Sequence, residues 1–200
     1  MHGPGNEHLS KPEWRALLLR ERSAVSAGQH AADAAALAAA AAELVGKTSP
    51  ATVCAYVPFG SEPGSSSLLE ALQEAGARVL LPVIPPVPGP LDWAEYAGPD
   101  TLVPGRLRGV REPAGPRLGS PTLGEAGLVL VPALAVDRRG TRLGRGAGFY
   151  DRSLVHLSPD ADLLAVVRDP ELVERLPGEP HDVRVSGALT PGLGVVRWAV

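Results

Sequence analysis

The stretch "DRRGTRLGRGAGFYDR", residues 137–152, gathers four glycines and five arginines around a carboxylate. Its glycines alternate within "LGRGAG", and the missing Cβ of glycine lets neighbouring backbone N–H groups turn toward one point. A helix that begins here would add free N–H groups, and Arg142 and Arg145 would add charge-assisted hydrogen bonds. The pattern is typical of a phosphate-binding loop. A glycine-rich turn with solvated arginines fits the same residues equally well.

Asp151 follows this loop directly. A carboxylate beside a polyphosphate repels it unless a divalent cation lies between them, and Mg²⁺ commonly binds one or two carboxylates together with phosphate oxygens. The alternative role is that of a first-turn aspartate that stabilises a helix N-terminus. Lys11 and Arg15 lie four residues apart, so they share one face of a helix, where they either reach an anion or are solvated. The residue types leave both pairs of alternatives open.

The elements that would position these residues follow from hydrophobic patterning and turn residues. Ser10 and Glu13 have capping-box spacing, and Gly46 is expected to end the second helix. The sequence predicts helices over about 10–23, 30–45, 67–76 and 148–157, and strands within 51–58, 78–84, 91–96, 126–136, 161–168 and 193–200. The region 85–121 is rich in Pro and Gly and is too long for a bare loop, so we expect short strands or an ordered excursion there.

Strands that are apolar throughout and alternate with helices predict an α/β fold, with a mostly parallel sheet covered by helices on both faces. A chain of 200 residues suits a single domain, here expected over residues 9–200 after a disordered tail at 1–8. The net charge of −3 gives no global reason to expect nucleic acid or an anionic membrane as a partner. The lone Cys54 cannot form an internal disulfide, and the N-terminus lacks signal-peptide features, so we expect a cytoplasmic protein.

Four stretches together resemble the 5-formyltetrahydrofolate cyclo-ligase (5,10-methenyltetrahydrofolate synthetase) family. The longest, "VPALAVDRRGTRLGRGAGFYDR", is similar to the family signature "VPG-LAFD--G-RLG-G-G-YYD". "KPEWR" resembles its Lys-x-x-x-Arg on the first helix, and "GVREPAG" its "I-EP" element. "AYVPFGSEPGSSSLLEAL" and "LPGEPHDVRVSGALTP" resemble two further segments in the same order. The resemblance implies the NagB/RpiA/CoA-transferase-like fold.

The resemblance also implies that the protein uses ATP and Mg²⁺ to close 5-formyltetrahydrofolate into 5,10-methenyltetrahydrofolate. We expect these small molecules as its partners, no nucleic acid or membrane, and a monomer. Asp151 would bind the metal, and Arg145, Tyr150 and Asp151 would be catalytic. Tyr56 and Glu62 would bind the folate, bordered by Arg145, Gly146, Ala147, Gly148 and Phe149. The residues implied to bind ATP are Lys11, Arg15, Arg142, Leu143, Gly144, Arg145, Gly146, Ala147, Gly148, Phe149 and Tyr150.

Two departures from the family pattern bear on activity. Ser186 stands where many members have a second metal-binding aspartate, and Phe149 stands where a tyrosine is usual. The first departure keeps a second function open, that of a catalytically weakened paralogue that only binds folate or nucleotide. A phosphosugar isomerase or acyl-CoA transferase on a related sheet is a third class, but its catalytic carboxylate motif is not found here.

Overall fold

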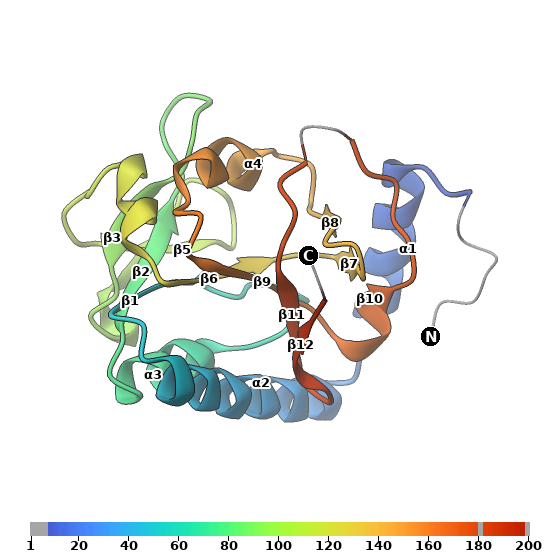
Figure 1. Cartoon of the computed structure of the whole chain (residues 1–200), viewed down its shortest axis with the longest axis horizontal. Helices are drawn as coiled ribbons and strands as arrows, with labels where there is room; N and C mark the ends of the chain where they lie inside the picture. The colour runs from blue at the N-terminus through green and yellow to red at the C-terminus, as the bar shows by residue number, and fades with distance from the viewer. Residues whose placement is uncertain (1–7, 180–181, 199–200) are drawn as a thin grey trace.

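The computed structural model describes residues 8–179 and 182–198, so most of the expected tail at 1–8 lies outside the described residues. Seven strands form the main sheet in the order β12-β11-β9-β6-β1-β2-β3 (Figure 1). The five inner strands β11, β9, β6, β1 and β2 run parallel, and the two edge strands β3 and β12 are antiparallel to their neighbours. The mostly parallel α/β sheet is therefore confirmed. The strands of this sheet are β1 (Thr52–Cys54), β2 (Arg78–Val83), β3 (Asp92–Glu95), β6 (Leu128–Pro132), β9 (Asp162–Val166), β11 (Gly187–Thr190) and β12 (Gly194–Arg197).

The two faces of the sheet are covered differently. Helices α2 (Ala27–Thr48) and α3 (Ser66–Glu74) pack together on one face, below the sheet in Figure 1. The other face is covered by the short helix α4 (Phe149–Ser153) and the 3₁₀ turns η2 (Ser120–Glu125) and η3 (Leu154–His156). Successive residues of β1 enter the two cores in turn, since Val53 packs toward α2 and α3 while Cys54 packs toward the turns. The sheet is thus buried on both faces, as its apolar strands require.

The first two helices show which capping signals operate. Helix α1 (Lys11–Ser23) begins as expected, because the Glu13 carboxylate accepts the Ser10 backbone N–H at 2.8 Å. Helix α2 is longer than expected at both ends, and Gly46 lies inside it, so the prediction that Gly46 ends the helix is wrong. The helix ends instead at Thr48, and the residue that caps it, Ser49, has a left-handed φ of 47°. One interior glycine costs only about 1 kcal/mol, less than the buried face of a long helix contributes.

The Pro/Gly-rich region 85–121 contains short strands, as expected. Besides β3, it forms the two-stranded sheet of β4 (Leu102–Pro104) and β5 (Arg111–Pro113), with the 3₁₀ turn η1 (Pro99–Thr101) before it. Strand β11 was not predicted, because its short run "GALT" lies between loop-forming residues. The register of β11 beside β9 and β12 makes it a fully buried strand.

The run expected as one strand over 126–136 divides into two. After β6 the chain bends and continues as β7 (Ala135–Asp137), which pairs with β8 (Arg142–Leu143) and β10 (Leu172–Val173) in a separate sheet. Trp14 and Leu18 of α1 pack on this small sheet, which lies beside α1 in Figure 1. The glycine-rich stretch leaves β8 and enters α4, so α1 and β8 fix one side of it. The 3₁₀ turn η4 (Asp169–Glu171) connects β9 to β10. Within the described residues, no helix is both long and apolar enough to cross a membrane.

Candidate active site

A pocket of about 260 Å³ opens at the carboxyl ends of the central parallel strands. Tyr56 follows β1, Ile84 follows β2, and Ala133 follows β6, and all three line it. Open α/β sheets bind their ligands at this edge, since the loops that leave parallel strands meet there. Apart from Ser186, every residue implied to bind a substrate or metal lines this one pocket, namely Lys11, Arg15, Tyr56, Glu62, Arg142, Leu143, Gly144, Arg145, Gly146, Ala147, Gly148, Phe149, Tyr150 and Asp151.

The glycine-rich loop forms one wall of the pocket together with α1. Gly146 has a φ of +97°, which strongly favours glycine, and a Cβ there would lie 3.3 Å from the guanidinium carbon of Arg15. Arg15 in turn donates from Nε to the Gly144 carbonyl at 3.0 Å. Because α4 has only five residues, its dipole adds little, and the loop backbone and the cations supply the positive potential.

Arg142 and Asp151 form an ion pair at the end of this loop. Their Nη2 and Oδ1 atoms are 2.6 Å apart, and the Arg142 guanidinium lies 5.8 Å from the centre of the Tyr150 ring. The Arg142 side chain is only 5% exposed, whereas 41% of the Asp151 side chain is exposed. Among the described residues, Arg142 Nε is one of the few buried polar atoms without a hydrogen-bond partner. Asp151 is thus accessible from the pocket, and its charge is balanced by a buried cation.

Lys11 meets two carboxylates at the rim. Its Nζ lies 3.0 Å from Asp182 Oδ2 and 3.0 Å from Glu179 Oε1. Partial burial opposes the charge, but the hydrogen bonds to Asp182 and Glu179 outweigh it and raise the pKa of Lys11. Lys11 is therefore a cation at neutral pH, and it holds Asp182 at the pocket.

Ser186 lies elsewhere, which corrects its assignment as a second metal position. The Ser186 hydroxyl donates to Asp162 Oδ1 at 2.7 Å. Asp162 is the first residue of β9, so Ser186 lies at the amino ends of the parallel strands, opposite to the pocket. The ladder between β9 and β11 fixes this placement, because the Ser186 backbone N–H donates to the Leu163 carbonyl. The carboxylate of this run that lines the pocket is that of Asp182. Among the described residues no group of three His, Cys, Asp or Glu side chains could hold a metal by itself.

The other wall of the pocket has a buried acid. Glu62 is 5% exposed, accepts the Phe59 backbone N–H at 3.3 Å, and pairs with Arg145 Nε at 3.1 Å. The Arg145 guanidinium lies 4.8 Å from the centre of the Phe59 ring, a cation–π arrangement. Burial raises the pKa of Glu62, and the charge of Arg145 opposes that rise only in part. An acceptor with this environment suits a ligand that brings its own N–H donors.

Two tyrosines complete this side. The Tyr56 hydroxyl donates to the Pro63 carbonyl at 3.1 Å, which anchors the loop that carries Glu62. Burial raises the pKa of both Tyr56 and Tyr150, so both phenols keep their protons at neutral pH. Ile84 after β2 covers the same side together with three apolar side chains from the Pro/Gly-rich region, Leu91, Leu107 and Val110. A flat, largely apolar ring system could therefore lie against this wall.

Sequence reasoning missed several pocket residues. Arg22, Phe59, Arg111 and Asp182 line the pocket, although none of them was assigned a ligand from the sequence. Arg22 could have been found, since it continues the face of α1 that carries Lys11 and Arg15. The others lie within the family-like stretches 55–72, 109–115 and 176–191, but the packing of distant segments that brings them to the pocket has no local signal in the sequence.

Comparisons with known proteins agree with this geometry. A model of the 5-formyltetrahydrofolate cyclo-ligase family matches residues 7–191. A 5-formyltetrahydrofolate cyclo-ligase of Mycolicibacterium smegmatis is 52% identical over 94% of this chain and 96% of its own length. The Escherichia coli K12 protein of the same name is 34% identical over 70% of this chain and 78% of its own.

A solved structure has the same fold. The 5,10-methenyltetrahydrofolate synthetase of Aquifex aeolicus superposes with a TM-score of 0.75, covering 96% of this chain and 94% of that chain at 24% identity. The synthetase of Mycoplasma pneumoniae superposes with a TM-score of 0.71 at 17% identity, covering 90% of this chain and 98% of that one.

Proposed function

This chain belongs to the 5-formyltetrahydrofolate cyclo-ligase family and has its ligase activity, and we propose that the pocket at the carboxyl ends of β1, β2 and β6 is where the reaction occurs. In that reaction ATP and 5-formyltetrahydrofolate give 5,10-methenyltetrahydrofolate, ADP and phosphate. The observation that carries the assignment is the division of one pocket into a cationic, glycine-rich wall and an apolar wall with a buried acid.

The chemistry explains why both walls are needed. The formyl oxygen attacks the γ-phosphorus of ATP, the bond to ADP breaks, and the formyl carbon becomes electrophilic. N10 then attacks that carbon and releases its proton to the departing phosphate or to solvent, phosphate leaves with the former formyl oxygen, and the methenyl cation remains. Phosphoryl transfer of this kind requires alignment and charge neutralisation more than covalent help from the protein. The pocket offers both, because its two walls bring the substrates side by side.

On the nucleotide side, Lys11, Arg15, Arg142 and the loop backbone bind the phosphates. Arg15 supports the loop through Gly144, so it both contributes charge and fixes the backbone that carries the N–H groups. The buried Arg142 is held in place by Asp151 and lies against the Tyr150 ring, which limits its rotamers. Such preorganised cations stabilise the charge that develops during transfer without reorganising at that moment.

On the folate side, Glu62 accepts hydrogen bonds from the pterin N–H groups while Tyr56 supports its loop. Arg145 contacts Glu62 and lies within the glycine-rich loop, so it connects the two walls. When the phosphates of ATP attract the Arg145 guanidinium, Glu62 loses this ion pair and accepts hydrogen bonds from the pterin N–H groups instead. Arg145 therefore serves both substrates, and its loss should weaken nucleotide binding most.

Mg²⁺ is part of the proposal. The pocket fits a cation that relies on phosphate oxygens, because Asp151 and Asp182 face it and the described residues contain no complete protein cage. Asp151 and Asp182 would hold the ion. When bound, Mg²⁺ supplies charge neutralisation of the triphosphate. We also propose that the protein acts as a cytoplasmic monomer, to which the buried free thiol of Cys54 is suited.

An absorbance assay tests the function, since the methenyl product absorbs in the near ultraviolet and the 5-formyl substrate does not. With ATP and Mg²⁺, the wild type should form product, and Asp151→Asn should lower kcat by about 100-fold or more, as the loss of a preorganised electrostatic group does. Asp160→Asn, at an exposed turn, is the matched control and should retain the wild-type rate. Wild-type turnover by Asp151→Asn would remove the metal assignment.

An inactive wild type that still binds folate or nucleotide would favour the weakened paralogue. That alternative depended on Ser186, which lies beside the amino end of β9, at the opposite end of the strands from the pocket. The substitution at this position therefore removes no group from the site.

A further inference from the structure

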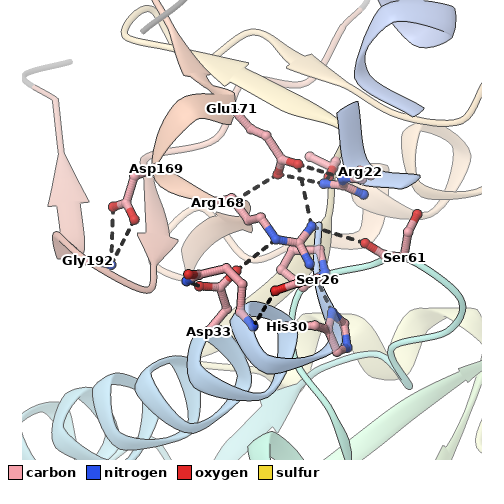
Figure 2. Close-up of polar contacts among 12 residues, drawn as sticks. Arg22, Ser26, His30, Asp33, Ser61, Arg168, Asp169, Glu171 and Gly192 are labelled. Atoms are coloured by element: carbon pink, nitrogen blue, oxygen red, sulfur yellow. Dashed lines mark hydrogen bonds and ion pairs between the residues drawn. The ribbon is translucent and has the colours of Figure 1, made fainter. Parts of the chain in front are cut away.

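A buried network of ion pairs adjoins the folate side of the pocket (Figure 2). It contains the guanidinium groups of Arg22 and Arg168 and the carboxylates of Asp33 and Glu171, all of which are at least nine-tenths buried. These residues come from the end of α1, from α2, and from the segment between β9 and β10. Glu171 joins the two halves, because it pairs with Arg22 at 2.6 Å and accepts the Arg168 backbone N–H at 2.8 Å.

Arg168 is the member of this network that reaches the substrate loop. Its Nη1 donates to the Ser61 carbonyl at 3.1 Å, and Ser61 directly precedes Glu62. Its Nε donates to Asp33 Oδ2 at 2.9 Å, and its Nη2 lies 3.0 Å from His30 Nδ1. Figure 2 shows the guanidinium surrounded by these three partners. Partners on α2 thus fix the guanidinium that holds the backbone next to Glu62.

The energetics of buried ion pairs indicate that this network positions groups at the pocket rather than stabilises the fold. Replacing a buried ion pair by apolar side chains of similar volume is often neutral or stabilising, because the desolvation cost offsets the attraction. Stability alone is therefore a weak reason to bury two guanidinium groups beside a pocket. A planar, forked guanidinium, however, can hold a carboxylate and a carbonyl at fixed angles, which an apolar cluster cannot do.

We propose that Arg168 is a positioning residue for folate binding: held by Asp33 and Glu171, it fixes the Ser61 carbonyl and thereby sets the place of the Glu62 carboxylate. This inference rests on the proposed function of Glu62. Arg22 performs the corresponding task at the end of β6, where its Nη2 donates to the Ala133 carbonyl at 2.6 Å. Glu171 couples the two, so the loop with Glu62 and the chain at Ala133 are held by one connected network.

The test separates KM values for the two substrates. Arg168→Lys keeps the charge, but a single ammonium cannot bond Asp33 and Ser61 in the same geometry. It should raise KM for 5-formyltetrahydrofolate about tenfold, the effect of one charge-assisted hydrogen bond, and leave KM for ATP unchanged. Asp33→Asn, which preserves shape, should raise the same constant by a smaller factor and provides the test if Arg168→Lys does not fold.

Thr190→Val is the matched control. The Thr190 hydroxyl donates to Asp169 Oδ1 at 2.7 Å, so its loss perturbs the residue next to Arg168 without touching Ser61. Thermal melts measure the loss of stability in each variant. The proposal predicts a raised folate KM in the Arg168 and Asp33 variants only. An unchanged folate KM in both, or an equal rise in Thr190→Val, would overturn it.

Glu62→Gln distinguishes this inference from the proposed function. If Glu62→Gln raises the folate KM while Arg168→Lys and Asp33→Asn leave it unchanged, Glu62 binds folate and only the positioning role fails. If Glu62→Gln also leaves the folate KM unchanged, the folate assignment itself fails.

Discussion

Glu62 shows what a buried site residue costs the protein. Its carboxylate has two partners, the Phe59 backbone N–H and Arg145, but burial remains the larger influence and its pKa is raised. The unfolded chain leaves this group solvated at its ordinary pKa. At pH values above the raised pKa, ionised Glu62 therefore lowers the free energy of unfolding. This destabilisation decreases as the pH falls through the raised pKa and is gone below the ordinary pKa of glutamate.

Glu62→Gln should consequently separate stability from binding. At pH 8 we expect the variant to melt at a higher temperature than the wild type, because glutamine has no charge to desolvate, while its folate KM rises. The difference in melting temperature should shrink as the pH is lowered toward the ordinary range of glutamate. Glu74→Gln, on the exposed side of α3, should show neither effect. A lower melting temperature for Glu62→Gln at pH 8 would contradict this account.

Site residues could be predicted from the sequence only where they occur in one local run. The glycine-rich stretch and the pair Lys11 and Arg15 were identified in this way, because their spacing itself expresses a geometry. Asp182 reaches the pocket through its ion pair with Lys11, which is 171 positions away in the chain. The Arg145 guanidinium lies over the Phe59 ring, and no pattern of spacing in the sequence predicts such a contact. Ser186 was misplaced because similarity of position in a motif does not give its position along a strand.

At the scale of elements, the loop between β8 and α4 depends on glycine for both conformation and space. Gly146→Ala would force a left-handed conformation that costs of the order of 1–3 kcal/mol and would place a methyl group against Arg15. We expect KM for ATP to rise, because the loop backbone and Arg15 shift together. Kinetics with varied ATP measure this change.

Gly194→Ala is the control for backbone strain. Gly194 also has a positive φ, of +66°, but a Cβ there meets nothing within 4 Å and the residue is the first of β12, away from the pocket. This variant should lose stability and keep the wild-type KM for ATP. An equal rise in KM in both variants would show that strain alone, and not the site, is responsible.

Helix α2 offers a substitution that improves stability. Gly46 lies in the helix interior, and a Cβ there meets no atom within 4 Å. Gly46→Ala should therefore stabilise the protein by about 1 kcal/mol and raise its melting temperature by roughly 2–4 °C. Calorimetry measures the shift, and the folate and ATP KM values serve as controls that should not move. A lower melting temperature would argue that the helix ends before Gly46.

The elements also show where sequence patterns stop being informative. The apolar runs gave β1, β2, β6 and β9, since a strand buried on both faces needs apolar residues at every position. They could not show that the chain bends after β6, because Ala133 and Leu134 continue the same pattern. The sequence does not predict strand β11, because its pairing with two neighbouring strands, rather than its composition, makes it a strand.

For the whole molecule, the class of fold was predictable because alternation of helices and apolar strands restricts the possible topologies. The covering of one face by α4 and 3₁₀ turns was not, since those turns form on a sheet that already exists. The single-domain organisation stays a prediction. It implies one cooperative unfolding transition, which the core on either face of the sheet should share.

Two spectroscopic probes test whether the protein unfolds in a single cooperative transition. Tryptophan fluorescence reports on Trp14 beside the small sheet and Trp93 in the core under η2, while far-ultraviolet circular dichroism reports on the helices. The two denaturant curves should coincide. Mg-ATP at about 100 times its Kd should shift both together by about 2.7 kcal/mol. Two separate transitions would indicate independently folding parts.

The order of strands in the sheet has a consequence for how the protein is made. Strand β1 emerges from the ribosome well before β6, beside which it lies in the interior of the sheet. Until then its edge has unpaired backbone groups, a state that invites association with other nascent chains. Lys11 likewise meets Asp182 only after a further 171 positions have been translated. A message truncated before that codon would yield a polypeptide whose nucleotide wall is never completed.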